Sequence, residues 1–280
     1  MKRAASILLF CLIILGVLPK IAIAETNKKP QNTLFFGVAP QKSASEMAKT
    51  WTPFLNYLSK KASCEIHFKT ATNVTTFEER VASGEYDIAY LNPHFYVRPE
   101  SSDYKVFAKE KDVSLKGIII VRKESPYQKL KDLDGKIIVF PSPSAFAATL
   151  LPLAHFEKEG ISVNLKFVGS HESVYRSVEK ELYPAGGTIM KAIEQADPSI
   201  SKQLRVLWTS PSYTSHPIAA HKRVPKEVFL RLKAVMLSMD KDPEGMALLK
   251  DIGFKGIVEA NDSAYDDIRK LNINIPEVKE

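Results

Sequence analysis

Short apolar runs alternate with amphipathic stretches along the first third of the chain. Residues 33–39 (TLFFGVA) form an apolar run that is typical of a buried strand. Residues 45–61 carry apolar side chains at helical spacing, and residues 65–70 alternate as a second strand. A short helix is expected over 76–83 and a buried strand over 86–91. The series strand–helix–strand–helix–strand predicts an α/β unit with a parallel sheet.

The pattern restarts after a β-branched run at residues 116–122 (KGIIIVR). Beyond it we expect strands over 137–140, 163–168 and 204–208 and helices over 145–159, 172–178 and 186–196. The rest of the chain is predicted to be mainly helical, over 226–238, 244–252 and 264–271. Two α/β units in series predict two lobes, with residues 25–121 and 210–280 in lobe 1 and residues 122–209 in lobe 2.

The N-terminus has the pattern of an export signal. Lys2 and Arg3 precede an apolar stretch over 4–17, and residues 22–24 (AIA) match the small-x-small cleavage pattern. The apolar stretch is about 14 residues long, which is shorter than the roughly 20 that a membrane-spanning helix needs. We therefore predict a cleaved signal peptide over residues 1–24 and a periplasmic mature protein. An uncleaved N-terminal anchor is the alternative.

Charge and cysteine content narrow the class of partner. The formal net charge is +7, and removal of residues 1–24 lowers it to +4 because Lys2, Arg3 and Lys20 leave with no acids. This mild basicity is spread along the chain without a block of like charges, so it does not indicate nucleic-acid binding. The mature chain keeps one cysteine, Cys64, and forms no internal disulfide.

No motif of a known catalytic site is present. The sequence lacks a G-x-S-x-G elbow, a P-loop, an H-E-x-x-H helix and a cluster of Cys and His at metal-ligand spacing. The six histidines are scattered, and the nearest useful pair, His216 and His221, offers two nitrogens where catalytic zinc takes three protein ligands. We expect a protein that is not an enzyme, with no catalytic residues, no metal and no cofactor. An acid/base pair without a motif is the alternative, since carboxylates are plentiful.

Two strand-to-helix turns could bind an anion. Ligands of parallel sheets sit beyond the carboxyl ends of the strands, where helix starts present free N–H groups. The turn over 140–145 (FPSPSA) adds the hydroxyls of Ser142 and Ser144. At 169–172 (GSHE), Ser170 or His171 could donate to an oxyanion. Either turn could equally be a plain N-cap with nothing bound.

A third loop, residues 90–96 (YLNPHFY), ends a predicted strand with aromatic and amide groups. These aromatic side chains belong either to the core or to a ligand wall.

Several segments, taken in order, resemble one family: the substrate-binding proteins of phosphate/phosphite/phosphonate ABC transporters. They are residues 37–40 (GVAP), 51–58 (WTPFLNYL), 84–90 (GEYDIAY), 140–143 (FPSP), 169–174 (GSHESV), 207–211 (LWTSP), 253–256 (GFKG) and 265–268 (YDDI). The resemblance runs from about residue 33 to 271, and it is the order and spacing of the segments that make it specific.

The resemblance implies an α/β fold of the type II periplasmic-binding-protein class, with two lobes joined by two crossovers and a ligand cleft between them. It implies that a small anionic solute is bound and passed to a membrane ABC permease. A monomer that binds no nucleic acid is expected. Two alternatives are a periplasmic sensor that signals to a membrane receptor kinase and an enzyme of the same fold.

The resemblance also places a ligand site. Carried over by position, the ligand-binding residues are Gln41, Tyr90, Asn92, Ser142, Ser144, Ala145, Phe146, Ser170, His171 and His216. The chain departs from the family where a hydroxyl-rich turn is expected, since residues 145–148 read AFAA, and where His216 replaces an acid that would face an aminoalkyl ammonium. The ligand could therefore be a phosphate-like oxyanion or an organic acid rather than an aminophosphonate.

Overall fold

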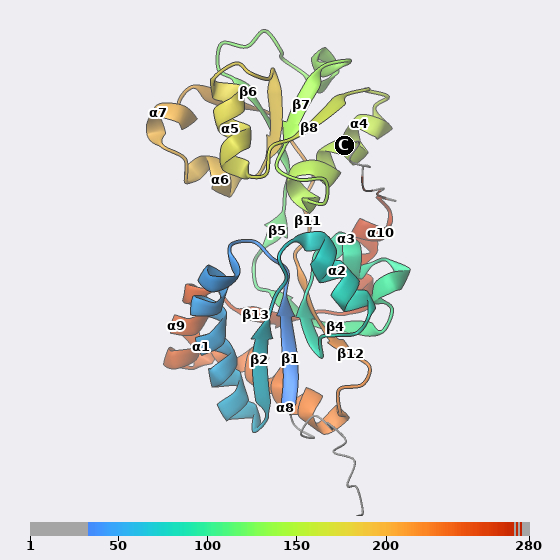
Figure 1. Ribbon diagram of the computed structural model, residues 1–280, viewed down its shortest axis with the longest axis vertical. Coiled ribbons are helices and arrows are strands. Elements are labelled where there is room, and N and C mark those ends of the chain that lie inside the picture. Colours follow the sequence, from blue (N-terminus) through green and yellow to red (C-terminus); the bar gives the residue numbers. More distant parts are fainter. Residues whose placement is uncertain (1–32, 272, 274, 276–280) are drawn as a thin grey trace, which may run out of the picture. The chain divides into compact units, whose positions relative to one another are not determined.

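Two β-sheets with helices on their faces organise the chain (Figure 1). The computed structural model describes residues 33–271, 273 and 275. The predicted signal peptide, residues 1–24, lies outside the described residues. The described residues belong to one compact unit.

The first sheet has six strands in the order β13-β4-β12-β3-β1-β2. Its strands are β1 (Thr33–Val38), β2 (Glu65–Lys69), β3 (Ile88–Tyr90), β4 (Tyr104–Glu110), β12 (Pro217–His221) and β13 (Ile257–Glu259). β1 pairs in parallel with β2 and β3, whereas β12 runs antiparallel to both β3 and β4. Its α-helices are α1 (Ala44–Ala62), α2 (Val74–Ala82), α3 (Pro93–Tyr96), α8 (Lys226–Ser238), α9 (Pro243–Asp251) and α10 (Asp266–Arg269), with short 3₁₀ turns over Pro99–Ser101, Met239–Lys241 and Asp262–Tyr265.

The second sheet has five strands in the order β10-β6-β9-β7-β8. They are β6 (Ile118–Arg122), β7 (Ile137–Phe140), β8 (Asn164–Phe167), β9 (Ala185–Thr188) and β10 (Leu204–Thr209). The accompanying helices are α4 (Leu151–Lys158), α5 (His171–Glu179), α6 (Met190–Glu194) and α7 (Pro198–Ser201), with a 3₁₀ turn over Leu130–Leu133 and a π-helical turn over Phe146–Leu150 that leads into α4.

The two sheets repeat one topology. In each, the first strand of the unit lies between the second and the third, and an antiparallel strand separates the third from the fourth. That antiparallel strand is β12 in the first sheet and β6 in the second. Each of them is the first strand that the chain adds to its sheet after crossing over from the other sheet. We refer to the two units as the first and second lobes.

Two short segments connect the lobes and pair with each other. β5 (Ser114–Leu115) and β11 (Tyr213–Thr214) form an antiparallel two-stranded ladder. Close by, the Ser210 N–H donates to the Gly117 carbonyl at 2.9 Å, and the Gly117 N–H donates to Ser210 Oγ at 3.0 Å. The second sheet begins at Ile118, so the lobe border drawn from the sequence between residues 121 and 122 falls inside β6.

Each sheet is packed on both faces. In the first lobe one core gathers Phe36, Phe54 and Leu232, and the core on the other face gathers Phe77 and Tyr265. The second lobe likewise has a core on each side of its sheet. This two-sided burial accounts for the near-continuous apolar runs in β1, β3, β6 and β7, because strands covered on both faces have no polar side.

One predicted helix is wrong in its first half. Residues 186–196 were expected to be helical, but Ala185–Thr188 is strand β9 and the helix α6 starts only at Met190. The glycine pair explains the difference. A Cβ on Gly186 would lie 2.6 Å from Val174 Cγ1, and one on Gly187 would lie 2.3 Å from the Ala148 carbonyl oxygen. β9 is therefore a strand over which helices pass too closely for side chains.

Three strands of the first sheet were also missed by the hydrophobic pattern. β4 was not predicted, and β12 and β13 lie in a region that was expected to be mainly helical. β4 pairs with β12 and β13, which form only after the chain returns from the second lobe. The local periodicity of the sequence carries no information about such long-range pairing. The helices in the described part of the chain all fall short of the length and apolar character that crossing a membrane requires.

Candidate functional site

The two predicted anion turns are neighbours at the carboxyl edge of the second sheet. β7 and β8 run in parallel, with Phe140 opposite Phe167. Directly beyond the strands, the Val168 N–H donates to the Phe140 carbonyl at 3.0 Å, and the Gly169 N–H donates to the Pro141 carbonyl at 2.9 Å. The helix starts that follow the two strands are thereby held side by side.

The turn after β7 opens with a wide helical turn. The amides of Thr149 and Leu150 both donate to the Ala145 carbonyl, at 2.8 and 3.2 Å, and Thr149 Oγ1 donates to the Ser142 carbonyl at 2.8 Å. The amides ahead of Thr149 belong to the open first turn, where a helix has no carbonyl of its own to offer them. Phe146 is the first residue of that turn, so its N–H and those that follow can receive an anion.

Two glycines hold this turn against the sheet. A Cβ on Gly117 would lie 1.9 Å from the Ala147 carbonyl oxygen, and one on Gly187 would lie 2.3 Å from that of Ala148. The backbone of the turn therefore rests directly on the backbone of the segment before β6 and of β9. Its position is set by close packing rather than by a flexible loop.

The turn after β8 is capped by its own serine. Ser170 Oγ accepts from the Ser173 N–H at 3.0 Å and lies 2.9 Å from Ser173 Oγ. This is the N-cap role that was the alternative to ligand binding at this position. The amides of the first turn of α5, beginning with His171, are what the turn can offer to an anion.

His171 is fixed by a buried threonine. Its Nδ1 lies 2.8 Å from Oγ1 of Thr188, a fully buried residue at the end of β9. Burial lowers the pKa of His171, so the ring is neutral at pH 7. Its Nε2 has no hydrogen-bond partner among the described residues. Thr188 was not selected from the sequence, because the strand that carries it had been predicted as helix.

The first lobe contributes an aromatic stack at the end of β3. The Tyr90 and His216 rings stack with centroids 5.2 Å apart, and the Leu91 N–H donates to the Pro217 carbonyl at 3.0 Å. Burial raises the pKa of Tyr90, whose hydroxyl also hydrogen-bonds the Gln41 side chain. Burial, followed by the charge of His94, lowers the pKa of His216 to about 4. Three of the predicted residues, Gln41, Tyr90 and His216, are thus brought together, and both rings are uncharged at pH 7.

The remaining predicted residues occupy different settings. Asn92 is partly exposed and precedes α3, where it makes no capping hydrogen bond. Ser142, Ser144 and Ala145 are partly exposed in the turn after β7.

Phe146 is buried, and its ring reaches across to His94 of the first lobe and Tyr213 of the connecting ladder. The ring stacks on His94 at a centroid distance of 5.9 Å and meets Tyr213 edge-on at 6.3 Å. Its backbone N–H, and not its ring, is therefore the group that can take part in binding.

Glu110 is a residue of this region that the sequence did not reveal. It ends β4, one residue beyond Lys109, which pairs with Pro217. Burial raises the pKa of Glu110 to about 7, and the charges of Lys191 and Lys255 act in the opposite direction. No local signal marks it, because its neighbours are supplied by the pairing of β4 with β12.

Within residues 33–271, 273 and 275, no group of three or more His, Cys, Asp or Glu side chains lies close enough together to hold a metal ion.

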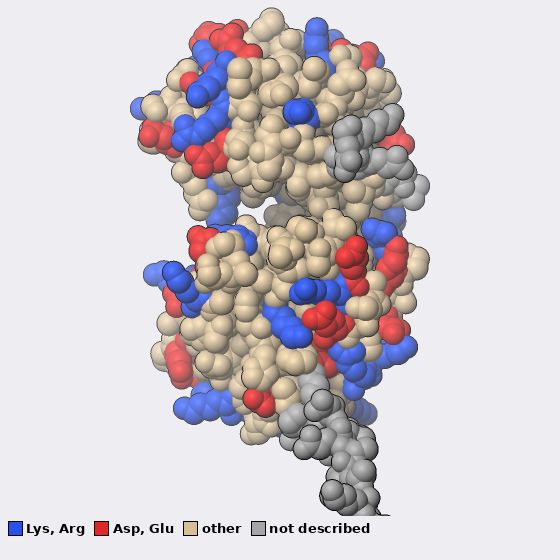
Figure 2. All heavy atoms as spheres, in the orientation of Figure 1, with Lys and Arg blue, Asp and Glu red and all other residues tan. Residues whose placement is uncertain are grey.

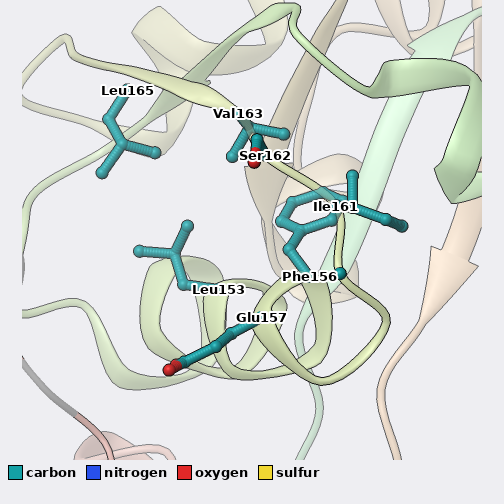
Figure 3. A pocket seen from close by; sticks show the side chains of 8 residues that line it. Leu153, Phe156, Glu157, Ile161, Ser162, Val163 and Leu165 are labelled. Atoms are coloured by element: carbon teal, nitrogen blue, oxygen red, sulfur yellow. The ribbon is translucent and has the colours of Figure 1, made fainter.

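A pocket of about 400 Å³ lies between α4 and the edge strand β8 (Figure 3). It is lined by Leu153, Phe156, Glu157, Gly160, Ile161, Ser162, Val163 and Leu165, none of which belongs to the predicted ligand site. Basic and acidic side chains are interspersed over the face shown in Figure 2. That face therefore has no large patch of one charge sign.

Comparison with known proteins identifies the family of this chain. A family model described as "ABC transporter, phosphonate, periplasmic substrate-binding protein" matches residues 36–265. The phosphonates-binding periplasmic protein of Escherichia coli K12 is 25% identical over 288 residues, which cover 96% of this chain and 84% of that protein.

Solved structures share the fold. PhnD1 of Prochlorococcus marinus, in complex with methylphosphonate, superposes with a TM-score of 0.74 at 19% identity and covers 87% of this chain and 98% of that one. XAC2383 of Xanthomonas citri, bound to chloride, superposes with a TM-score of 0.76 at 17% identity and covers 86% of this chain and 96% of that one. The α/β fold of the type II periplasmic-binding-protein class, predicted from the sequence, is confirmed.

Proposed function

The chain belongs to the family of periplasmic substrate-binding proteins of phosphonate ABC transporters, and from this premise we propose that it binds a small phosphonate or phosphate-like anion between its lobes and delivers it to a membrane permease. Members of this family act outside the cytoplasm. The predicted signal peptide over residues 1–24 supplies the export step, and the mature protein acts as a monomer.

One observation carries the proposal: the helix starts after β7 and β8 are held side by side, with the Gly169 N–H bonded to the Pro141 carbonyl at 2.9 Å. Two sets of free amides and two helix dipoles can then act on one oxyanion. Ala145 and Ala147 bring no hydroxyls, so backbone amides, Ser144 and His171 provide the donors. A hydrogen bond to a charged oxygen contributes about 1.5–3 kcal/mol, so a handful of such donors suffices for tight binding.

The first lobe closes the site from the other side. Tyr90, His216 and Gln41 form a rigid wall, because the two rings stack and the tyrosine hydroxyl is held by the glutamine. Closure about the paired β5 and β11 removes water from the anion and strengthens each hydrogen bond to it. The permease then recognises the closed state, which the ligand populates because it contacts both lobes only in that state.

The first experiment is thermal unfolding of the mature protein with methylphosphonate, phosphate, phosphite and acetate as separate additives. A bound anion at about 100 times its Kd raises the free energy of unfolding by about 2.7 kcal/mol. We expect at least one of the phosphorus oxyanions to give this stabilisation, and ³¹P NMR to return it chemically unchanged. No stabilisation by any phosphorus oxyanion contradicts the proposed ligand class, and a new phosphorus species contradicts the binding role.

Two substitutions test the placement of the site. His171→Ala and Ser144→Ala are each expected to weaken binding by about tenfold, the loss of one hydrogen bond to a charged group, with little change in the free energy of unfolding. His67→Ala, an exposed histidine on β2, is the control and should bind as the wild type does. Unchanged affinity in both site variants would place the ligand elsewhere.

A further inference from the structure

Three side chains form a row across the carboxyl edge of the first sheet. Ile218 of β12 lies opposite Tyr90 of β3 on one side and opposite Ala108 of β4 on the other. Residues two apart in a strand point to the same face. His216, two residues before Ile218, and Glu110, two residues after Ala108, therefore share the face that carries Tyr90.

The register brings Glu110 next to His216. Lys109 pairs with Pro217 as the last pair of the antiparallel ladder, and Glu110 and His216 are the next residues of the two chain segments beyond it. The charge of Glu110 also acts on Tyr90, which places the carboxyl near this ring. The His216 ring in turn stacks on Tyr90. Glu110 thus extends the wall that the first lobe presents to the ligand.

Glu110 is partly buried and unpaired. Its backbone pairs with Ile257 of β13, but its carboxyl makes no ion pair within 4.0 Å and no hydrogen bond to the residues that the structure describes. Lys255, which precedes β13, and Lys191 of α6 in the second lobe are close enough for their charges to act on it. Burial nevertheless dominates and raises the pKa of Glu110 to about 7. A partly buried carboxyl that loses its remaining water when a ligand covers it needs either a proton or a donor.

A fully ionised oxyanion cannot satisfy this carboxyl. An ionised carboxylate accepts hydrogen bonds and donates none, and the same is true of a sulfonate. A phosphonate or phosphate differs, because it loses its last protons only near or above neutral pH. Two acidic groups that share a site hold one proton between them, which turns a repulsive contact into a hydrogen bond.

We propose that Glu110 determines the specificity of the site by sharing a proton with the bound oxyanion, so that tetrahedral anions of the phosphonate and phosphate class are accepted and those of the sulfonate and sulfate class are rejected. This inference rests on the proposed function, since it assigns the ligand class for the same site. The rejection works through an unfavourable contact rather than through a missing favourable one.

The test compares two tetrahedral anions of similar size that differ in their ability to carry a proton. Isothermal titration calorimetry at about pH 8 measures the Kd of methylphosphonate and of methanesulfonate for the wild type, for Glu110→Gln and for Glu227→Gln. Glu227 is an exposed carboxylate in the first turn of α8 and serves as the control. The wild type and the control should prefer methylphosphonate by about 100-fold or more, and Glu110→Gln should reduce this preference by about tenfold or more, mainly by gaining affinity for methanesulfonate through the amide donor.

A pH series on the wild type gives an independent readout that does not depend on the variant folding. Methanesulfonate has no proton to lose near neutrality, so a change in its affinity reports on the protein. Its affinity should rise about tenfold between about pH 8 and pH 6, as Glu110 takes up a proton. The other charged or titratable groups that face Glu110 are Tyr90, His216, Lys191 and Lys255; burial raises the pKa of Tyr90 and lowers that of His216 to about 4, so both of these rings stay uncharged over this range.

The outcomes separate the two proposals. If the wild type and Glu110→Gln bind methylphosphonate and discriminate equally against methanesulfonate, the role of Glu110 is wrong and the proposed function stands. A flat pH series for methanesulfonate in the wild type likewise overturns the role of Glu110. If the wild type binds neither anion, nor phosphate or phosphite, the proposed function fails and the role of Glu110 fails with it.

Discussion

The carboxyl edges of the two sheets have the same strand order and different chemistry. At the edge of the second sheet, helix starts beyond β7 and β8 supply backbone donors, and one neutral histidine joins them. At the edge of the first sheet, Tyr90, His216 and Glu110 stand in a row of rings and a carboxyl. The topology determines where a ligand can bind, and the residues just beyond the strands determine which ligand it is.

The helix starts at the two edges differ in what already occupies them. In the first lobe, the long helix α1 begins with a capping box of Ser43 and Glu46, and α3, which follows β3, spans only Pro93–Tyr96. An acid in the first turn offsets the positive potential of a helix start, and a single turn aligns few peptide dipoles. In the second lobe, the turn over Phe146–Leu150 has no side-chain cap, so its backbone N–H groups are open to an anion.

The largest effect should come from breaking the backbone contact that holds the second-lobe edge. In Gly117→Ala the new Cβ would lie 1.9 Å from the Ala147 carbonyl oxygen, and the two hydrogen bonds with Ser210 prevent Gly117 from moving away. We expect a loss of about 3 kcal/mol in the free energy of unfolding, measured with urea, together with loss of anion binding.

Gly256→Ala is the matched control. Its Cβ would meet the side chains of Lys111 and Asp240, which can shift, so the loss should stay below about 1 kcal/mol. Equal losses in the two variants would show that the turn after β7 does not depend on close packing at Gly117.

Sequence patterns were informative where structure depends on neighbours along the chain. The strands that became β7 and β8 and the helix starts that follow them were predicted, because an apolar run followed by a Ser- or Pro-containing turn is a local signal. The site residues that these turns carry followed from the same signal and from the family resemblance. Both sources concern residues that are adjacent in sequence.

The features that the sequence did not reveal depend on contacts between distant parts of the chain. β9 was predicted as helix, because nothing near Gly186 shows that Val174 will pack against its backbone. Thr188, at the end of that strand, was missed with it. Glu110 had no signal at all, since β12, which brings His216 to this edge, pairs with β4 only when the chain returns from the second lobe. Long-range pairing creates such sites, and periodicity cannot report it.

An intermediate effect should come from His216, on the first-lobe edge. The folded state keeps its pKa near 4, below the usual value of 6.5, so between these values the unfolded chain takes up a proton that the native state refuses. Stability therefore falls as the pH drops from 6.5 towards 4, by about 2 kcal/mol after allowance for solvent around the partly exposed ring. His216→Gln should reduce this loss in urea unfolding at about pH 7 and pH 4.5.

Glu110 contributes with the opposite sign. Its pKa is raised to about 7, so its contribution to stability is present at low pH and is lost as the pH rises towards 7. The comparison must therefore be made between variants at each pH. A His216→Gln protein with the wild-type dependence on pH would contradict a His216 ring that stays neutral in the folded state.

The smallest effect should come from Thr188→Val, which sharpens the comparison at the second-lobe edge. Valine keeps the volume of this fully buried side chain and removes the hydroxyl that lies 2.8 Å from His171 Nδ1. We expect stability to fall by about 1 kcal/mol and anion affinity to weaken by about threefold, because the ring loses its orientation. Thr188→Ser should restore both. If Thr188 acts by positioning His171, Thr188→Val will not change the Kd further in a His171→Ala background, and additive losses in the double variant would assign Thr188 an effect of its own.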